Sequence, residues 1–200
     1  MAQVGQRLHT PDRPSLVRVG SGRRPICTQR RIDTRLTPAA AHTATTQAVG
    51  SQPGNSFGTG KSVPLIAMAH GIPYVATASV ADLHDLEAKV TKAMAIAGAR
   101  YVHVHVPCPL GWGCDPSYTL KVARLAVESG LFPLFEAEYG EVVARTAIRS
   151  LVKVDEYLKL QRRFHHLFAA PGEPAVVAAI QAQADRNIKR FGLLEKGAAQ

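Results

Sequence analysis

The sequence of 200 residues contains few cysteines, few aromatic residues and no long apolar run. Its three cysteines, Cys27, Cys108 and Cys114, are an odd number, which argues against a disulfide framework and favours a reducing, cytoplasmic setting. No run reaches about 18 apolar residues, so we expect no membrane-spanning helix and no membrane partner. The amino terminus has no continuous apolar segment, which argues against a secretory signal.

Acidic residues are scarce at the start of the chain. Residues 1–36 hold eight Arg and two Asp, a net charge of +6, which leaves +3 of the total of +9 for residues 37–200. Residues 1–60 show no sustained apolar period, so we predict a basic, irregular or disordered leader. This charge fits either a solvated tail or nucleic-acid contact. We favour the tail, because the segment has almost no aromatic residues to stack on bases.

The stretch Gly58-Thr-Gly-Lys-Ser62 is similar to the end of a phosphate-binding loop, but the residues before it do not fit that motif. That motif requires a glycine five positions before Gly60, where this sequence has Asn55, and Gly54 misses the position by one. No strand-like stretch precedes it. We therefore predict no nucleotide-binding P-loop.

Residues 61–170 are predicted to form one α/β domain. Residues 74–78 and 101–106 resemble buried strands, and a helix between them carries apolar residues at spacings of three and four. This pattern predicts a parallel β-α-β crossover. Residues 64–70 favour a short helix before it. We place Asp85 and Lys89 as an ion pair on the outer face of the longer helix.

The remaining elements complete this prediction. A helix begins near Pro116 and ends at Gly130. Strands over 132–139 and 142–148 form a hairpin at Gly140-Glu141. An amphipathic helix covers 154–168. Residues 171–200 are a separate C-terminal segment, with a helix over 174–194. The predicted class is α/β, with a mostly parallel sheet flanked by helices and a C-terminal hairpin and helices.

The chemistry-bearing residues gather after the strand at 101–106. Pro107 and Pro109 end the strand, a short loop carries Cys108 and Cys114, and Asp115-Pro116 starts the next helix. The two cysteines are six positions apart, which is not a zinc-binding spacing. His103 and His105 share one strand face. They form either a metal cluster with Cys108 or, as we favour, a core pair facing a helix. We expect His165 and His166 to be solvated.

Several long sequence words, in order, resemble the β subunit of pyruvate:ferredoxin oxidoreductase (pyruvate synthase), in its carboxyl-terminal part only. They cover roughly residues 37–168 and are Ala69-His-Gly-Ile-Pro-Tyr-Val-Ala-Thr-Ala-Ser79, His103-Val104, Pro107-Cys108-Pro-Leu-Gly-Trp-Gly113, Asp115-Pro-Ser, Leu125-Ala-Val-Glu-Ser-Gly130, Pro133-Leu-Phe-Glu136 and Glu156-Tyr-Leu-Lys-Leu-Gln161.

The resemblance implies a partial thiamine-diphosphate-binding fold and a subunit that oxidatively decarboxylates pyruvate to acetyl-CoA. Its cofactors are thiamine diphosphate with Mg²⁺ and [4Fe–4S] clusters. Its partners are other oxidoreductase subunits, ferredoxin or flavodoxin, pyruvate and coenzyme A. By the same match, Cys108 is the fourth thiolate ligand of the cluster nearest thiamine, while Cys27 and Cys114 match no ligand.

The sequence also departs from that family. The family's Cys-x-x-Cys pair and its Gly-Asp-Gly motif for Mg²⁺ do not occur in this sequence. We therefore expect a chain that is incomplete and inactive alone, with no catalytic or thiamine-binding residue assigned. Two alternatives are a non-catalytic remnant or scaffold subunit and, less favoured, a basic nucleic-acid-binding protein.

Overall fold

The structure, a computed structural model, describes residues 40–42, 48–49, 52–53 and 62–194. Most of the predicted leader over 1–60, including Cys27, lies outside these residues. Two short strands, β1 (Ala48–Val49) and β2 (Gln52–Pro53), form an antiparallel pair. Among the described residues, no helix combines the length and apolar character needed to cross a membrane.

The predicted β-α-β unit lies at the centre of the fold. It consists of β3 (Tyr74–Ser79), α3 (Leu83–Ala95) and β4 (Arg100–His105). The two strands are parallel, with Tyr74 opposite Arg100 and Ser79 opposite His105. Every residue of β3 is buried, because helices cover both faces of the sheet at this strand. This part of the prediction is confirmed.

The ion pair of α3 was predicted on the wrong face. Lys89 is only 4% exposed, and its Nζ donates hydrogen bonds to the Thr77 carbonyl at 2.9 Å and to Asp85 at 2.7 Å. The long side chain runs along the inner face of α3 and reaches a β3 carbonyl, so its charge is satisfied without solvent. The helix begins at the N-cap Asp82, which accepts from the Asp85 amide.

The sheet has the strand order β4-β3-β5-β6. Strand β5 (Phe135–Glu138) pairs antiparallel with β3, and β6 (Glu141–Arg145) pairs antiparallel with β5. The α/β class and the hairpin are confirmed, but the expectation of a mostly parallel sheet is wrong. The Thr77 hydroxyl explains the position of β5. It accepts from the Phe135 amide at 2.9 Å and donates to the Pro133 carbonyl at 2.7 Å.

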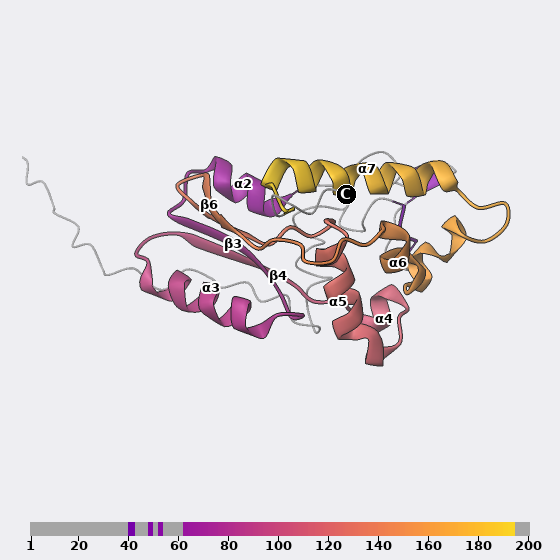
Figure 1. Cartoon of the computed structure of the whole chain (residues 1–200), viewed down its shortest axis with the longest axis horizontal. Coiled ribbons are helices and arrows are strands. Elements are labelled where there is room, and N and C mark those ends of the chain that lie inside the picture. The colour runs from indigo at the N-terminus through magenta and orange to yellow at the C-terminus, as the bar shows by residue number, and fades with distance from the viewer. Residues whose placement is uncertain (1–39, 43–47, 50–51, 54–61, 195–200) are drawn as a thin grey trace, which may run out of the picture.

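Helices cover both faces of the sheet. Figure 1 shows α2 (Val63–Ala69) and α7 (Pro174–Phe191) along one face and α3 along the other. Alternate residues of β3 serve the two sides, because successive side chains of a strand point in opposite directions. Val75 packs in the cluster that contains Phe191 of α7, whereas Tyr74 and Ala76 pack in the cluster that contains Ala93 of α3.

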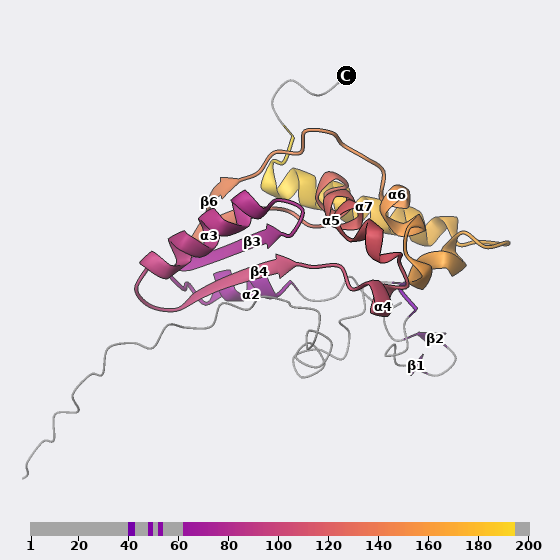
Figure 2. The same cartoon turned by 90° about the horizontal axis from the view of Figure 1, so that it is seen from below.

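A third cluster consists mainly of helices. The 3₁₀ turn η2 (Pro116–Tyr118) leads into α5 (Thr119–Glu128), which packs with α6 (Val154–Lys159) and η3 (Arg162–Leu167). In Figure 2, β3 and β4 point towards the end of the molecule where α4, α5 and α6 lie. Helix α7 joins this cluster to the sheet, since Ala184 packs in the helical cluster and Ile188 against the sheet.

The single helix predicted over 154–168 is wrong, because it breaks at Gln161. Gln161 has extended backbone angles (φ −124°, ψ 117°) and is 1% exposed. Its side-chain amide donates to the Tyr157 carbonyl at 2.7 Å, and its backbone amide donates to Leu158. The side chain therefore satisfies a carbonyl that a continuing helix would have satisfied with backbone.

Candidate functional site

Cys108 lies where the chain leaves the carboxyl end of β4. It is the N-cap of a one-turn helix, α4 (Pro109–Trp112), where the sequence predicted an open loop. Pro109 occupies the first helical position, and Gly113 ends the helix with the left-handed angles φ 65° and ψ 45°. The Cys108 thiol is half-buried, and its Sγ accepts from the Gly111 amide at 3.4 Å. The sulfur is thus oriented by the backbone in a residue that is only partly buried.

Cys114 has a different environment. It is 8% exposed, and its backbone amide donates to the Pro109 carbonyl at 3.1 Å. Burial raises the pKa of its thiol, and nearby Arg163 opposes that effect. A buried thiol of this kind behaves as a packed apolar group, in contrast to the half-buried Cys108.

Arg163 packs beneath the same loop and was missed by sequence reasoning. Its guanidinium carbon lies 3.9 Å from the centroid of the Trp112 ring. The adjoining turn is fixed to α4, because the Arg162 amide donates to the Gly113 carbonyl at 3.1 Å. The words of the resemblance stop at Gln161, just before this arginine. Nothing in the local pattern distinguishes it from its neighbour, the exposed Arg162.

The two strand histidines pack against aromatic rings. The His105 ring centroid lies 4.8 Å from that of Phe132 and 5.6 Å from that of Trp112, and the His103 ring lies 5.7 Å from Phe132. Burial lowers the pKa of both histidines, that of His105 to about 3 with further contributions from Arg163 and His103. The favoured core pair is found only in part, because both residues are half-buried and their rings face Phe132 and α4.

The surface histidines are only partly as predicted. His165 is exposed, but His166 is half-buried and stacks on His42 with ring centroids 3.6 Å apart. The His42 amide donates to the Arg163 carbonyl, so this contact joins the described part of the leader to η3. The sequence could not show it because the two histidines are far apart in the chain.

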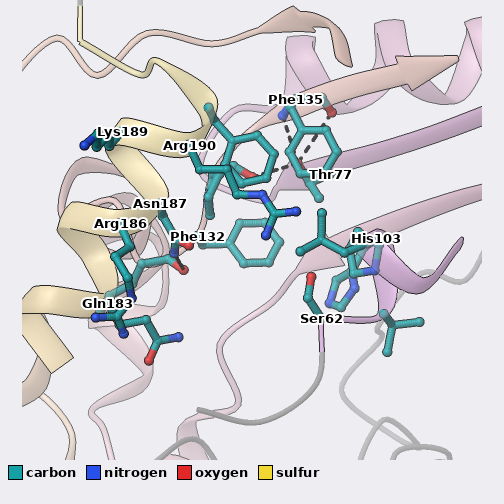
Figure 3. Close-up of a pocket in the computed structure, with 16 residues that line it drawn as sticks. Ser62, Thr77, His103, Phe132, Phe135, Gln183, Arg186, Asn187, Lys189 and Arg190 are labelled. Atoms are coloured by element: carbon teal, nitrogen blue, oxygen red, sulfur yellow. Dashed lines mark hydrogen bonds between the residues drawn. The ribbon is translucent and has the colours of Figure 1, made fainter. Parts of the chain in front are cut away.

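A pocket of about 930 Å³ lies between α2, the sheet and α7. Its lining includes three basic side chains of α7, namely Arg186, Lys189 and Arg190. Figure 3 shows the Arg190 side chain reaching towards Phe132 and Phe135, on the side of the pocket opposite Ser62 and His103. Lys189 and Arg190 also lie in the last turn of α7, where cations favour the helix dipole.

The structure allows a test of whether the residues fit the implied cofactors. Within the described ranges, no three His, Cys, Asp or Glu side chains form a group that could hold a metal ion, so the alternative cluster of His103, His105 and Cys108 is not formed. Cys108 by itself has the donor atom, exposure and amide contact of an iron–sulfur ligand. No described residue is assigned to thiamine diphosphate.

Within the described residues, the fold and the loop thus define an α/β arrangement with a half-buried cysteine at the carboxyl end of a parallel strand pair. No protein-family model matches the chain. It is 46% identical over 157 residues to pyruvate synthase subunit PorB of Methanosarcina barkeri. The matched segment covers 78% of this chain and 53% of that subunit. It is 41% identical over 159 residues to PorB of Methanocaldococcus jannaschii, with coverages of 78% and 51%.

A second group of relatives carries another name. Ketoisovalerate oxidoreductase subunit VorB of Pyrococcus abyssi is 41% identical over 109 residues, which is 54% of this chain and 35% of that subunit. The chain spans about half the length of the curated PorB relatives that match most of it. The resemblance inferred from the sequence is confirmed, because most of the chain is similar to PorB subunits over about half of their length.

Proposed function

We propose that this chain is a subunit of a 2-oxoacid:ferredoxin oxidoreductase in which Cys108 provides one thiolate to a [4Fe–4S] cluster. The position of Cys108 carries the proposal. Its thiol lies half-buried at the carboxyl end of β4, oriented by the Gly111 amide, within the sequence word that matches the family's ligand loop. A cubane cluster takes four thiolates, so the other ligands come from outside the described residues.

The proposed reaction follows the names of the relatives. Pyruvate is the proposed 2-oxoacid, because the PorB relatives are pyruvate synthase subunits. A branched 2-oxoacid is the alternative, because the VorB relatives are ketoisovalerate oxidoreductase subunits. Thiamine diphosphate with Mg²⁺ supplies the decarboxylation chemistry when bound. Coenzyme A accepts the acyl group, and electrons leave through iron–sulfur clusters to ferredoxin or flavodoxin.

The chain's own contribution is positional. We propose that the α4 turn orients the Cys108 sulfur through the Gly111 amide, within a thiamine-enzyme-like domain over residues 61–170. We propose that it works in the cytoplasm with other oxidoreductase subunits and is inactive alone. If those subunits give no turnover with it, the non-catalytic scaffold becomes the better description.

The first prediction tests the ligand. The chain is co-expressed with the other subunits, purified without oxygen, reduced with dithionite and measured by electron paramagnetic resonance. We expect Cys108→Ser to weaken or abolish a cluster signal, because a serine oxygen is a poorer iron ligand than a thiolate. The matched control, Cys27→Ser, should leave the signal unchanged. A signal that survives Cys108→Ser, or that is lost with Cys27→Ser, contradicts the assignment.

A further inference from the structure

Arg163 carries a positive charge into the protein interior. It is 5% exposed, and its Nε and Nη2 atoms donate to Gln161 Oε1 at 2.9 and 2.6 Å. Nη2 also lies 3.3 Å from the Tyr157 hydroxyl, and the guanidinium stacks on Trp112. A guanidinium remains protonated in proteins, so the charge is permanent.

All of these partners are neutral. Within the described part of the chain, Arg163 forms no ion pair with a carboxylate. Removing a charge from water is costly unless an opposite charge compensates it, and hydrogen bonds to an amide and a phenol compensate only in part. The arrangement is therefore expected when an anion binds nearby in the working protein.

The contacts of Arg163 identify where that anion would be. Trp112, on which the guanidinium stacks, ends the single helical turn that Cys108 begins. The backbone of η3 is hydrogen-bonded to Gly113, between the two thiols in sequence. The Trp112 amide donates to the Cys108 carbonyl at 2.9 Å, so the stacked guanidinium packs against the turn that holds Cys108. Burial lowers the pKa of the guanidinium, whereas Tyr157, Cys114 and Cys108 act in the opposite direction.

We propose that Arg163 is a positioning residue that compensates negative charge at Cys108 and favours the reduced form of a cluster bound there. The inference rests on the proposed function. Adding one electron to a thiolate-ligated cluster makes it more negative without forming or breaking a bond, and a nearby buried cation stabilises that added charge. An arginine that packs on Trp112 but whose charge is screened from Cys108 would leave the potential at Cys108 unaffected.

The electrostatic part can be measured on the chain itself. Cys108 is alkylated at fixed pH with anionic iodoacetate and with neutral iodoacetamide, and its peptide is quantified by mass spectrometry. The rate constant for iodoacetate divided by that for iodoacetamide is independent of the thiolate fraction, because both reagents react with the thiolate. This ratio therefore reports the electrostatic potential at Cys108. We expect the ratio to be about two- to fivefold higher in the folded chain than in urea, as Coulomb's law gives for a nearby unit charge. An equal ratio in both states overturns the proposal.

Variants separate charge from packing. Arg163→Gln should lower the ratio towards its value in urea, whereas Arg163→Lys should keep it raised. The control Arg149→Gln should not change the ratio, since Arg149 is an exposed arginine after β6. Buried Cys114 serves as the folding control, because it should stay slow to react in each folded variant. If Arg163→Gln makes Cys114 react quickly, that variant is not folded correctly. The proposal is then tested by Arg163→Lys and by the comparison of the folded chain with the chain in urea. A ratio unchanged by Arg163→Gln in a folded chain contradicts the proposal.

The assembled complex tests the consequence for the cluster. A redox titration followed by electron paramagnetic resonance should give a lower midpoint potential for Arg163→Gln than for wild type, by about 59 mV if the reduction equilibrium changes tenfold. A cluster whose potential does not move overturns this inference alone. A complex in which Cys108 ligates no cluster overturns the proposed function, while the alkylation ratio still reports on the buried charge.

Discussion

At the residue scale, the state of His105 depends most clearly on its surroundings. Its Nε2 atom is buried and has no hydrogen-bond partner among the described residues. The ring packs between Phe132 and Trp112, while Arg163 and His103 add unfavourable charge. These effects lower its pKa to about 3, so the folded protein keeps the imidazole neutral.

This lowered pKa predicts a pH-dependent loss of stability. Below its unfolded pKa of about 6.5, His105 binds a proton in the unfolded chain but not in the folded one, so stability decreases as the pH falls towards 3. Urea unfolding at pH 7, 6, 5 and 4 should show wild type losing free energy of unfolding relative to His105→Asn, approaching about 1.4 kcal/mol per pH unit. Parallel pH profiles for the two proteins would contradict the burial argument.

At the scale of elements, the site depends on how closely α4 approaches η3. Gly113 ends α4 with φ +65°, and a Cβ atom there would lie 2.6 Å from the Arg162 Cβ. Gly71, which follows α2, has a similar φ of +62° but open space around it. The two glycines therefore share the backbone conformation and differ in packing.

Alanine substitutions exploit this difference. Gly71→Ala should cost about 1 kcal/mol, the penalty of a left-handed conformation for an L-residue. Gly113→Ala should cost at least about 1 kcal/mol more, because η3 must move to make room. Urea unfolding measures both, and faster alkylation of Cys114 in Gly113→Ala would show that the loop has shifted. Equal costs for the two variants would mean that α4 and η3 are not tightly packed.

At the scale of the molecule, apolar groups remain exposed at an edge of the sheet and on the Cys108 loop. β6 lies at one end of the sheet order and all five of its residues are exposed, including Val143 at 51%. Leu110, within the helical turn that Cys108 caps, is 98% exposed. An unpaired strand edge and exposed apolar side chains both favour association with another chain.

We therefore predict that the purified chain self-associates. Light scattering coupled to size-exclusion chromatography should give a mass that rises with concentration. Val143→Lys should reduce that rise, because a charged side chain on an edge strand opposes strand pairing. Leu83→Lys, at an exposed apolar position in α3, is the control for added charge away from the edge. A mass of one chain at every concentration contradicts the prediction, as does association that Leu83→Lys reduces as much as Val143→Lys.

The local features of this protein follow from short stretches of sequence. The alternation of β4, the helical spacing of α3 and the cap at Asp115 are set by residues a few positions apart, so their elements could be placed in advance. The same holds for Cys108, whose loop is bounded by two prolines and whose sequence word carries part of the resemblance.

How those elements meet depends on contacts between residues far apart in the chain. β5 runs antiparallel to β3 because Thr77 binds a segment 58 residues away, a contact that no local pattern encodes. Burial of Lys89 depends on a β3 carbonyl 12 residues earlier. Arg163 and Arg162 are identical in type, and only packing against Trp112 places one charge inside and leaves the other in solvent. Partner choice and burial are properties of the assembled fold, so they became visible only in three dimensions.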